Sequence, residues 1–234
     1  MSRTFRIGPA RIAVGLLATM MLAGAPALAA DDAPPEVSKD GLKLVKKTDQ
    51  RLVYLKPGAT FSQYDKVMIL DCYVEFAKNW EKDFNNSAVG LQDRVSDQDV
   101  QRMKTGLAAE FKKVFIDELQ NKGGYQVVDT AAPDVLLLRP ALINVKVNAP
   151  DLMTPGVVAT VANSAGQMTL YLELWDSATS TILARVMDAE ADRGGFAQVS
   201  NSVTNKVAAD RILQSWAEDL RKRLDAVRAA PAAP

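Results

Sequence analysis

The sequence predicts an α+β domain in which a mixed, mainly antiparallel sheet of about five strands carries two long helices on one face. Three observations support this prediction. Apolar and polar residues alternate with a period of two through Gln167–Arg193, and apolar residues recur at helical spacing in two long stretches elsewhere. A strand, a helix and a second strand also follow one another between residues 64 and 128. Of the 234 residues, 48% are hydrophobic and 24% are charged, which is ordinary for a globular domain.

The segment Gln167–Arg193 is expected to form a hairpin at the centre of the sheet. Period-two alternation places four aliphatic residues on one face of its first arm: Met168, Leu170, Leu172 and Leu174. Asp176–Ser180 is a turn, because Asp and Ser side chains bond nearby backbone groups. The second arm begins near Ile182 and becomes acidic before its end.

The other predicted strands are Leu52–Leu55, Tyr64–Phe76, Tyr125–Val128 and Asp134–Asn148. The first is a short edge strand, and the last is bent at Pro140, which cannot donate a ladder hydrogen bond. A right-handed crossover through the intervening helix makes the Tyr125–Val128 strand parallel to the Tyr64–Phe76 strand.

Two long helices are predicted. The first covers Asp97–Asn121, with Ser96 as its N-cap and acidic side chains in its first turn, where they suit the helix dipole. The second covers Ser202–Val227 and has an apolar stripe that includes Trp216. Both stripes are typical of helices that pack on a core.

Two loops are long enough to carry a function. Ala77–Val95 is polar but contains Trp80 and Phe84, which either belong to a binding surface or pin the loop to the domain. Pro150–Ala165 is small and apolar, and its valines either contact a partner or membrane or pack as a short segment.

The N-terminus is expected to be a secretory signal peptide that is cleaved after residue 29. Three arginines precede a short apolar run, and Ala27–Ala29 is a small-x-small cleavage site. An uncleaved anchor is the weaker alternative, because the run is too short to span a membrane comfortably. The predicted divisions are a signal peptide (1–29), a flexible leader (30–39), one α+β domain (40–228) and a disordered tail (229–234). No transmembrane segment is expected in the mature chain.

The same segment predicts where the protein acts. Leu22–Ala25 resembles the Leu-Ala-Gly-Cys signal of bacterial lipoproteins, but Ala25 stands where the lipid-bearing cysteine would be. A lipid anchor is therefore not expected at this position, and the mature protein is predicted to be periplasmic.

The composition excludes several kinds of site. The chain has no histidine and a single cysteine, Cys72, which rules out His-based triads, His-ligated zinc, Cys-pair metal sites and an intramolecular disulfide. It has no phosphate-binding glycine motif, and we predict no cofactor and no metal. With 28 basic and 28 acidic residues, and a net charge of −3 once the three N-terminal arginines are removed, nothing favours nucleic acid. Cys72 lies in an apolar run, where we expect an unreactive thiol; pairing with another chain is the alternative.

No residue is predicted to be catalytic. Carboxylates nevertheless gather around the hairpin, and Glu173 and Asp188 would approach one another if they faced across paired strands. Such a pair would bind a hard cation or share a proton. We favour the alternative that these acids form ion pairs with Arg185 and Arg193.

Three blocks of sequence resemble a family of bacterial envelope proteins, domain of unknown function 3313, whose members are described as lipoproteins. The blocks are Leu52–Ile69, Gly123–Leu142 and Leu172–Gly195. The chain departs from the family at Ala25 and at Cys72, where such proteins often carry proline. Because the family has no established activity, the resemblance implies an envelope location but assigns no functional residue.

We expect a non-catalytic accessory or binding protein of the cell envelope, exported to the periplasm and contacting another envelope protein. Two alternatives remain open: a carboxylate-dependent enzyme acting on envelope glycans, and a small-ligand carrier that uses the loop Pro150–Ala165. A glycan enzyme would show two carboxylates at a defined separation, whereas a carrier would show a large apolar pocket.

Overall fold

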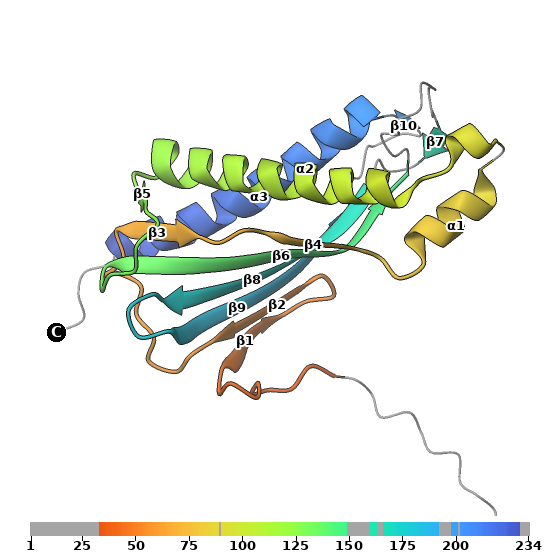
Figure 1. The fold of residues 1–234 in the computed structure, drawn as a ribbon. Coiled ribbons are helices and arrows are strands. Elements are labelled where there is room, and N and C mark those ends of the chain that lie inside the picture. Colours follow the sequence, from red (N-terminus) through yellow and green to blue (C-terminus); the bar gives the residue numbers. More distant parts are fainter. Residues whose placement is uncertain are drawn as a thin grey trace, which may run out of the picture. The chain divides into compact units, whose positions relative to one another are not determined.

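The computed structural model of the chain describes residues 33–88, 90–148, 160–162, 166–191, 198–200 and 202–229 (Figure 1). The chain divides into two units, residues 1–34 and residues 35–234, and the second contains every helix and strand that is described. The predicted signal peptide and nearly all of the predicted tail lie outside the described residues, so these divisions stay predictions.

In chain order the elements are β1 (Lys43–Lys47), β2 (Arg51–Leu55), β3 (Lys66–Ile69), β4 (Tyr73–Phe76), α1 (Trp80–Ser87), η1 (Leu91–Asp93), α2 (Asp97–Ile116), η2 (Asp117–Lys122), β5 (Gln126–Val127), β6 (Val135–Val147), β7 (Thr160–Ala162), β8 (Gly166–Asp176), β9 (Thr181–Ala191), β10 (Gln198–Ser200) and α3 (Ser202–Ala229). The element η1 is a short 3₁₀-helix, and η2 is a π-helix that continues α2.

The predicted α+β class with a mixed sheet is confirmed, but the predicted numbers of strands and helices were wrong. Within the described residues the main sheet has eight strands, not about five, in the order β1-β2-β9-β8-β6-β3-β5, and β4 also pairs with β6. Pairings from β1 to β6 along this order are antiparallel, whereas β3, β4 and β5 join in parallel. The described part also has three α-helices, not two, and β7 and β10 form a separate two-stranded sheet.

The predicted central hairpin is confirmed as β8 and β9, which pair antiparallel along their whole length. The four alternating aliphatic residues of β8 are all buried beneath α2 and α3 (Figure 1). We call this covered side of the sheet the helix face and the opposite side the outer face. The core of the helix face includes Phe111 and Phe115 of α2, whose ring centroids lie 3.9 Å apart, and Leu213 and Trp216 of α3.

The single strand predicted for Tyr64–Phe76 is wrong, because a bulge divides it into β3 and β4. Both halves pair with β6, but four residue steps separate Ile69 from Tyr73 while three separate their partners, Leu138 and Ala141. One extra residue changes which side chains face the core, since alternate residues of a strand point to opposite faces. The buried residues accordingly change from odd to even positions: Val67, Ile69, Cys72 and Val74.

Pro140 of β6 lies opposite this interruption, between the residues that pair with β3 and those that pair with β4. The carbonyl of Leu138 accepts a hydrogen bond from Leu70 N–H on that side, at 3.0 Å. The direction of backbone groups alternates along a strand, so the nitrogen of Pro140 points to the same side, where the pairing with β3 and β4 is interrupted. The shift in register of β6 lies farther on, between Ile143 and Lys146.

The polar loop predicted over Ala77–Val95 is also wrong, because it contains α1 and η1. Trp80 is buried at the start of α1, where its ring stacks on Phe76 at 4.4 Å between centroids and makes a tilted contact with Phe84 at 5.9 Å. Its indole N–H donates to the carbonyl of Val147 at 3.0 Å. Tertiary contacts of one aromatic side chain therefore hold a short helix whose other side chains are mostly polar.

The helix predicted from Asp97 begins as expected. Ser96 and Asp99 form a reciprocal capping box, in which each side chain accepts from the other residue's backbone N–H. The α-helix ends at Ile116, and the predicted remainder is the π-helical η2. Within η2, buried Glu118 accepts hydrogen bonds from Lys122 and from Arg221 of α3, which joins the two long helices.

The outer face is partly covered by the chain that precedes β1. Leu42, Tyr54 and Ile182 form a small buried cluster there, separate from the main core. Residues 35–39, which the sequence assigned to a flexible leader, make backbone contacts in this region. Ser38 N–H donates to the carbonyl of Leu42 at 2.8 Å, and the hydroxyl of Tyr54 donates to the carbonyl of Pro35 at 3.0 Å.

Candidate binding site

The two carboxylates singled out in the sequence do not form a pair. Glu173 lies opposite Arg185 in the β8–β9 register, whereas Asp188 lies opposite Leu170. Directly opposed residues share a face, and residues an odd number apart on one strand point to opposite faces. Asp188 therefore shares the helix face with Leu170, and Glu173 faces outward. The carboxylate pair that would have suited a glycan-cleaving enzyme is absent at these positions.

On the outer face, the carboxylate of Glu173 is buried and fully bonded. Oε1 accepts from the hydroxyl of Tyr171 at 2.8 Å and from Nε and Nη2 of Arg185 at 3.0 and 2.8 Å, while Oε2 accepts from the indole of Trp175 at 3.2 Å. Arg185 also bonds to Asp40 at 2.5 Å. Burial, followed by the bond to Glu173, raises the pKa of Tyr171 to about 12, so the hydroxyl stays a donor. The predicted ion pair with Arg185 is confirmed.

On the helix face, Asp188 belongs to a second ionic cluster. Its Oδ2 accepts from Nε of Arg51 at 2.8 Å and from Nη2 of the same guanidinium, whose Nη1 donates to Asp219 of α3 at 2.8 Å. The hydrogen bond to Asp188 raises the pKa of Arg51. Burial raises the pKa of nearby Glu190, and the charge of Asp188 adds to that effect. These contacts join β2 and β9 to α3. The other predicted ion-pair partner, Arg193, lies outside the described residues.

Other reactive groups are scarce in the described part of the chain. No three His, Cys, Asp or Glu side chains there are arranged to hold a metal ion. Burial raises the pKa of the Cys72 thiol to about 12, which agrees with the unreactive thiol predicted from its apolar surroundings. Among the described helices, none has both the length and the apolar character needed to cross a membrane.

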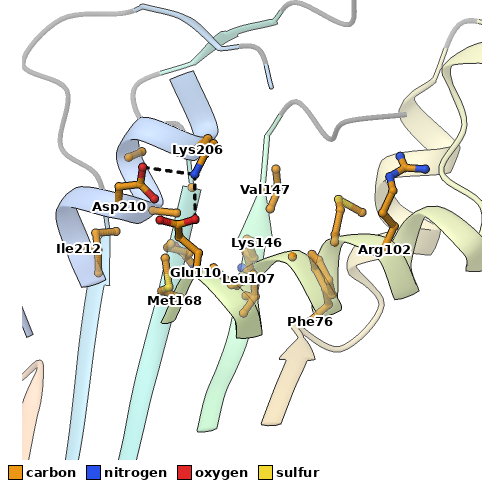
Figure 2. Close-up of a pocket in the computed structure, with 17 residues that line it drawn as sticks. Phe76, Arg102, Leu107, Glu110, Lys146, Val147, Met168, Lys206, Asp210 and Ile212 are labelled. Atoms are coloured by element: carbon orange, nitrogen blue, oxygen red, sulfur yellow. Dashed lines mark hydrogen bonds and ion pairs between the residues drawn. The ribbon is translucent and has the colours of Figure 1, made fainter. Parts of the chain in front are cut away.

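An apolar pocket of about 430 Å³ lies between α2, the beginning of α3 and the ends of β4, β6 and β8 (Figure 2). Its apolar lining includes Phe76, Met103, Leu107, Val147, Met168 and Ile212. Sites for small molecules are concave, mostly apolar and of this volume, with a few polar groups that orient the ligand. The geometry therefore fits a small-molecule site better than an active centre.

Gly106 lies within α2 and lines this pocket. A Cβ atom at this position would meet nothing within 4 Å, so no protein neighbour requires a glycine here. A glycine inside a helix costs about 1 kcal/mol relative to alanine. The helix thus carries a destabilising residue whose effect is to leave the pocket wider.

One end of the pocket is polar. Lys206 of α3 donates to Glu110 Oε2 at 3.1 Å and to Asp210 Oδ2 at 3.5 Å, as Figure 2 shows. Glu110 Oε1 accepts a hydrogen bond from Lys113 at 2.9 Å. This bond lowers the pKa of Glu110, and the bond from Lys206 lowers it further. The second oxygen of Asp210, Oδ1, is buried and has no hydrogen-bond partner in the described part of the chain. Glu110 and Asp210 also line a neighbouring cavity of about 540 Å³ along the α2–α3 groove.

The other end of the pocket is supported by α1 and its surroundings. Figure 2 shows Arg102 there, whose guanidinium forms an ion pair with Asp99 at 2.9 Å. Trp80 stacks on Phe76 and donates a hydrogen bond to the carbonyl of Val147. Both of these residues belong to the pocket wall. Trp80 is therefore a support of the pocket, which agrees with the alternative that it pins its segment to the domain.

Sequence reasoning missed most of this site, because its walls come from elements far apart in the chain. Two signals were available: a glycine at position 106 inside an amphipathic helix, and a tryptophan, Trp80, in a polar segment. The loop Pro150–Ala165, which the sequence suggested as a ligand site, lies outside the described residues apart from Thr160–Ala162. Val147 and Gly166, near its two ends, do line the pocket.

Residues 37–220 match the model of a family described as "Protein of unknown function (DUF3313)". The chain belongs to this family. The resemblance drawn from three blocks of the sequence is thereby confirmed. A comparison of this DUF3313 protein with curated proteins finds no match. The family description assigns no activity, so it adds no functional residue to the pocket.

Solved structures with a related outline are distant. Two are PelC dodecamers from Paraburkholderia phytofirmans: one is 10% identical with a TM-score of 0.35 and covers 73% of this chain and 97% of PelC. The other is 11% identical with a TM-score of 0.34, and the match covers 78% of this chain and 99% of PelC. A third is described as a homolog of neuraminyllactose-binding hemagglutinin from Helicobacter pylori. It is 11% identical with a TM-score of 0.33, and the match covers 71% of this chain and 85% of the homolog. Scores this low leave the role of the DUF3313 protein to be argued from its own residues.

Proposed function

We propose that this DUF3313 protein is a non-catalytic binding protein of the bacterial cell envelope that holds a small, largely apolar ligand. The observation that carries the proposal is the pocket between α2, α3 and the sheet. Its volume of about 430 Å³ suits a small molecule, and its apolar walls end at a few charged groups. Gly106 leaves it wide, and the buried ring of Trp80 supports its far wall.

The envelope location rests on the N-terminal sequence. We propose that residues 1–29 direct export and are removed, because three arginines, a short apolar run and a small-x-small site occur in that order. The mature protein would then act in the periplasm, without a lipid at Ala25.

A binding role is favoured over catalysis by the side chains that are present. The chain has no histidine, the commonest general base near neutral pH. Glu173 and Asp188 lie on opposite faces of the sheet, and each is bonded to an arginine. A carboxylate whose oxygens already accept hydrogen bonds from an arginine is a poor nucleophile.

Another envelope protein is the proposed partner, in the role of delivering or receiving the ligand. The sequence argument for a partner rested on the segment Ala77–Val95 as a binding surface. That segment contains α1, and the ring of its Trp80 turns into the domain. The pocket therefore gives the binding role a more specific basis than that surface does.

The proposal is tested by titrating the purified mature protein with N-phenyl-1-naphthylamine, a neutral apolar dye that fluoresces when it leaves water. We expect saturable binding to the wild type and loss of binding in Gly106→Phe, whose ring would occupy the pocket. Thr105→Phe is the matched control, because Thr105 is the exposed neighbour of Gly106 on α2 and does not line the pocket.

A companion variant separates blocking of the pocket from damage to the fold. Gly106→Ala should bind the dye and should unfold at a higher temperature, because alanine is favoured over glycine in a helix by about 1 kcal/mol. Dye binding that is absent in the wild type, or equal in Gly106→Phe and Thr105→Phe, would contradict the proposed function.

A further inference from the structure

We propose that the border of the main sheet at β1 is a docking surface for an anionic lipid membrane. The surface consists of residues 37–47, and we call it the basic edge. Its lysines meet the lipid phosphates, and its exposed valines enter the head-group layer. The inference goes beyond the proposed function, because it concerns where the protein docks and not what the pocket holds.

The position of β1 leaves its side chains accessible. It is an end strand of the main sheet, as Figure 1 shows, and each of its residues except Leu44 is exposed. The preceding chain covers only the beginning of its free side. Val37 forms an isolated antiparallel bridge with Lys43, and the N–H of Leu44 donates to the carbonyl of Glu36 at 2.8 Å. Beyond that bridge, residues 45–47 have no strand on this side within the described part of the chain.

The basic edge carries an excess of positive charge. Four exposed lysines there have no ion-pair or hydrogen-bond partner for their side chains among the described residues: Lys39, Lys43, Lys46 and Lys47. The one acidic residue of the segment, Asp40, is bound to Arg185. Glu36 and Asp49 flank the segment, so the lysines outnumber the acidic residues even when both are counted. Each lysine beside an anionic lipid surface strengthens binding roughly fivefold.

Exposed apolar side chains lie among these lysines and favour a membrane over a soluble polyanion. Val37 is 52% exposed and Val45 is 55% exposed, although large apolar side chains are more often buried. Proteins that lie on a membrane combine cations, which meet the lipid head groups, with apolar groups that enter the boundary of the acyl chains. A nucleic acid or an acidic polysaccharide offers no such apolar layer. The combination therefore fits a lipid surface.

Sedimentation of the purified mature protein with sucrose-loaded vesicles tests the proposal. We expect binding to phosphatidylcholine vesicles that contain about a quarter phosphatidylglycerol, and none to pure phosphatidylcholine. Binding should be lost in about 1 M salt, where screening limits the reach of a charge to about 3 Å.

Two sets of variants assign the binding to the basic edge. The double variant Lys46→Gln, Lys47→Gln should bind roughly 25-fold more weakly, since two lysines contribute about fivefold each. Lys46→Arg, Lys47→Arg keeps both charges and should bind like the wild type. Lys78→Gln, Lys82→Gln is the matched control, because these lysines are also exposed and without a side-chain partner in the described part of the chain. Val45→Ser should weaken binding several-fold, because serine loses the apolar contact.

The outcomes that overturn the proposal are specific. Equal sedimentation with both kinds of vesicle, or an equal loss in the edge variant and the control variant, contradicts docking through the basic edge. Unchanged binding of Val45→Ser contradicts entry of the valines into the head-group layer. Lysines of an end strand also prevent pairing with another chain. If that were their role, the wild type would not sediment with either vesicle, and Lys46→Gln, Lys47→Gln would self-associate.

The proposed function is tested independently of this surface. No residue of the basic edge lines the apolar pocket, so every edge variant should bind N-phenyl-1-naphthylamine like the wild type. Loss of vesicle binding with normal dye binding would concern the docking surface alone. Loss of dye binding in the wild type would concern the pocket alone.

Discussion

Replacing Glu173 with alanine should destabilise the protein strongly without affecting ligand binding. The carboxylate is 5% exposed, and it accepts hydrogen bonds from Tyr171, Trp175 and Arg185. Its removal leaves three donors on the outer face without their acceptor. The Arg185 side chain, 17% exposed, then keeps its ion pair with Asp40, whose side chain is 46% exposed, and its place over the Tyr171 ring at 5.7 Å.

The size of the effect follows from these contacts. Breaking a buried ion pair by removing one partner costs about 3–5 kcal/mol. Because Asp40 still bonds to Arg185, we expect the lower end, about 3 kcal/mol. For a domain of about 200 residues that corresponds to a melting temperature roughly 6–12 °C lower. Glu173→Gln should cost less, about 1–2 kcal/mol, because the amide oxygen still accepts from Tyr171 and Arg185, while the charge that pairs with Arg185 and the acceptor that meets Trp175 are lost.

Thermal unfolding followed by circular dichroism measures this prediction. Glu75→Ala is the control, because Glu75 is an exposed carboxylate of β4 and should change stability by less than about 0.5 kcal/mol. Dye binding by Glu173→Ala should match the wild type below the unfolding transition, since Glu173 faces away from α2 and α3. A melting temperature for Glu173→Ala equal to that of Glu75→Ala would refute the reasoning.

Three further predictions concern the helix joint, the thiol and the helix cap. Burial opposes ionisation of Glu118, but the bonds from Lys122 and Arg221 outweigh it and lower the pKa of Glu118 below its usual 4.5. Its contribution to stability is therefore present above pH 4.5 and lost as the pH falls through the lowered pKa; Glu118→Gln should abolish that part of the acid sensitivity in urea titrations. The Cys72 thiol, with its pKa raised to about 12, should react with a thiol reagent at pH 8 only after unfolding, and rapid labelling of the native protein would contradict its burial. Ser96→Ala should lower stability by about 1 kcal/mol in chemical denaturation, and no change would mean that the capping box is not formed.

The elements that sequence reasoning predicted well are those whose pattern is set locally. Alternation through β8 placed four aliphatic residues on one face, and the structure buries all four. Ser96 and the acidic residues after it marked the start of α2 correctly. In both cases the signal needs only neighbours within a few residues, so no knowledge of tertiary contacts is required.

The elements that could not be predicted from the sequence depend on residues far away in the chain. The extra residue between β3 and β4 is visible only against Leu138 and Ala141 of β6. The short helix α1 depends on Trp80 reaching Phe76 and Val147, and its own sequence reads as a polar loop. A local pattern cannot show either, because register and packing are set by the partner strand.

The candidate site could not be predicted for the same reason. The carboxylates Glu173 and Asp188 would have approached one another only if they faced across paired strands, and the register of β8 and β9 places them on opposite faces of the sheet. The pocket draws its walls from three strands and two helices. The local signals were Gly106, a residue that weakens a helix, and Trp80, an aromatic residue in a polar segment.

Nuclear magnetic resonance of methyl-labelled protein titrated with N-phenyl-1-naphthylamine tests the central claim most directly. Methyl groups that line the pocket, those of Met103, Met168 and Ile212, should shift and saturate together. Methyl groups of Leu137 and Met187, which belong to the outer face, should stay unchanged. Shifts on the outer face, or none at the pocket, would contradict the assignment of this pocket as the ligand site.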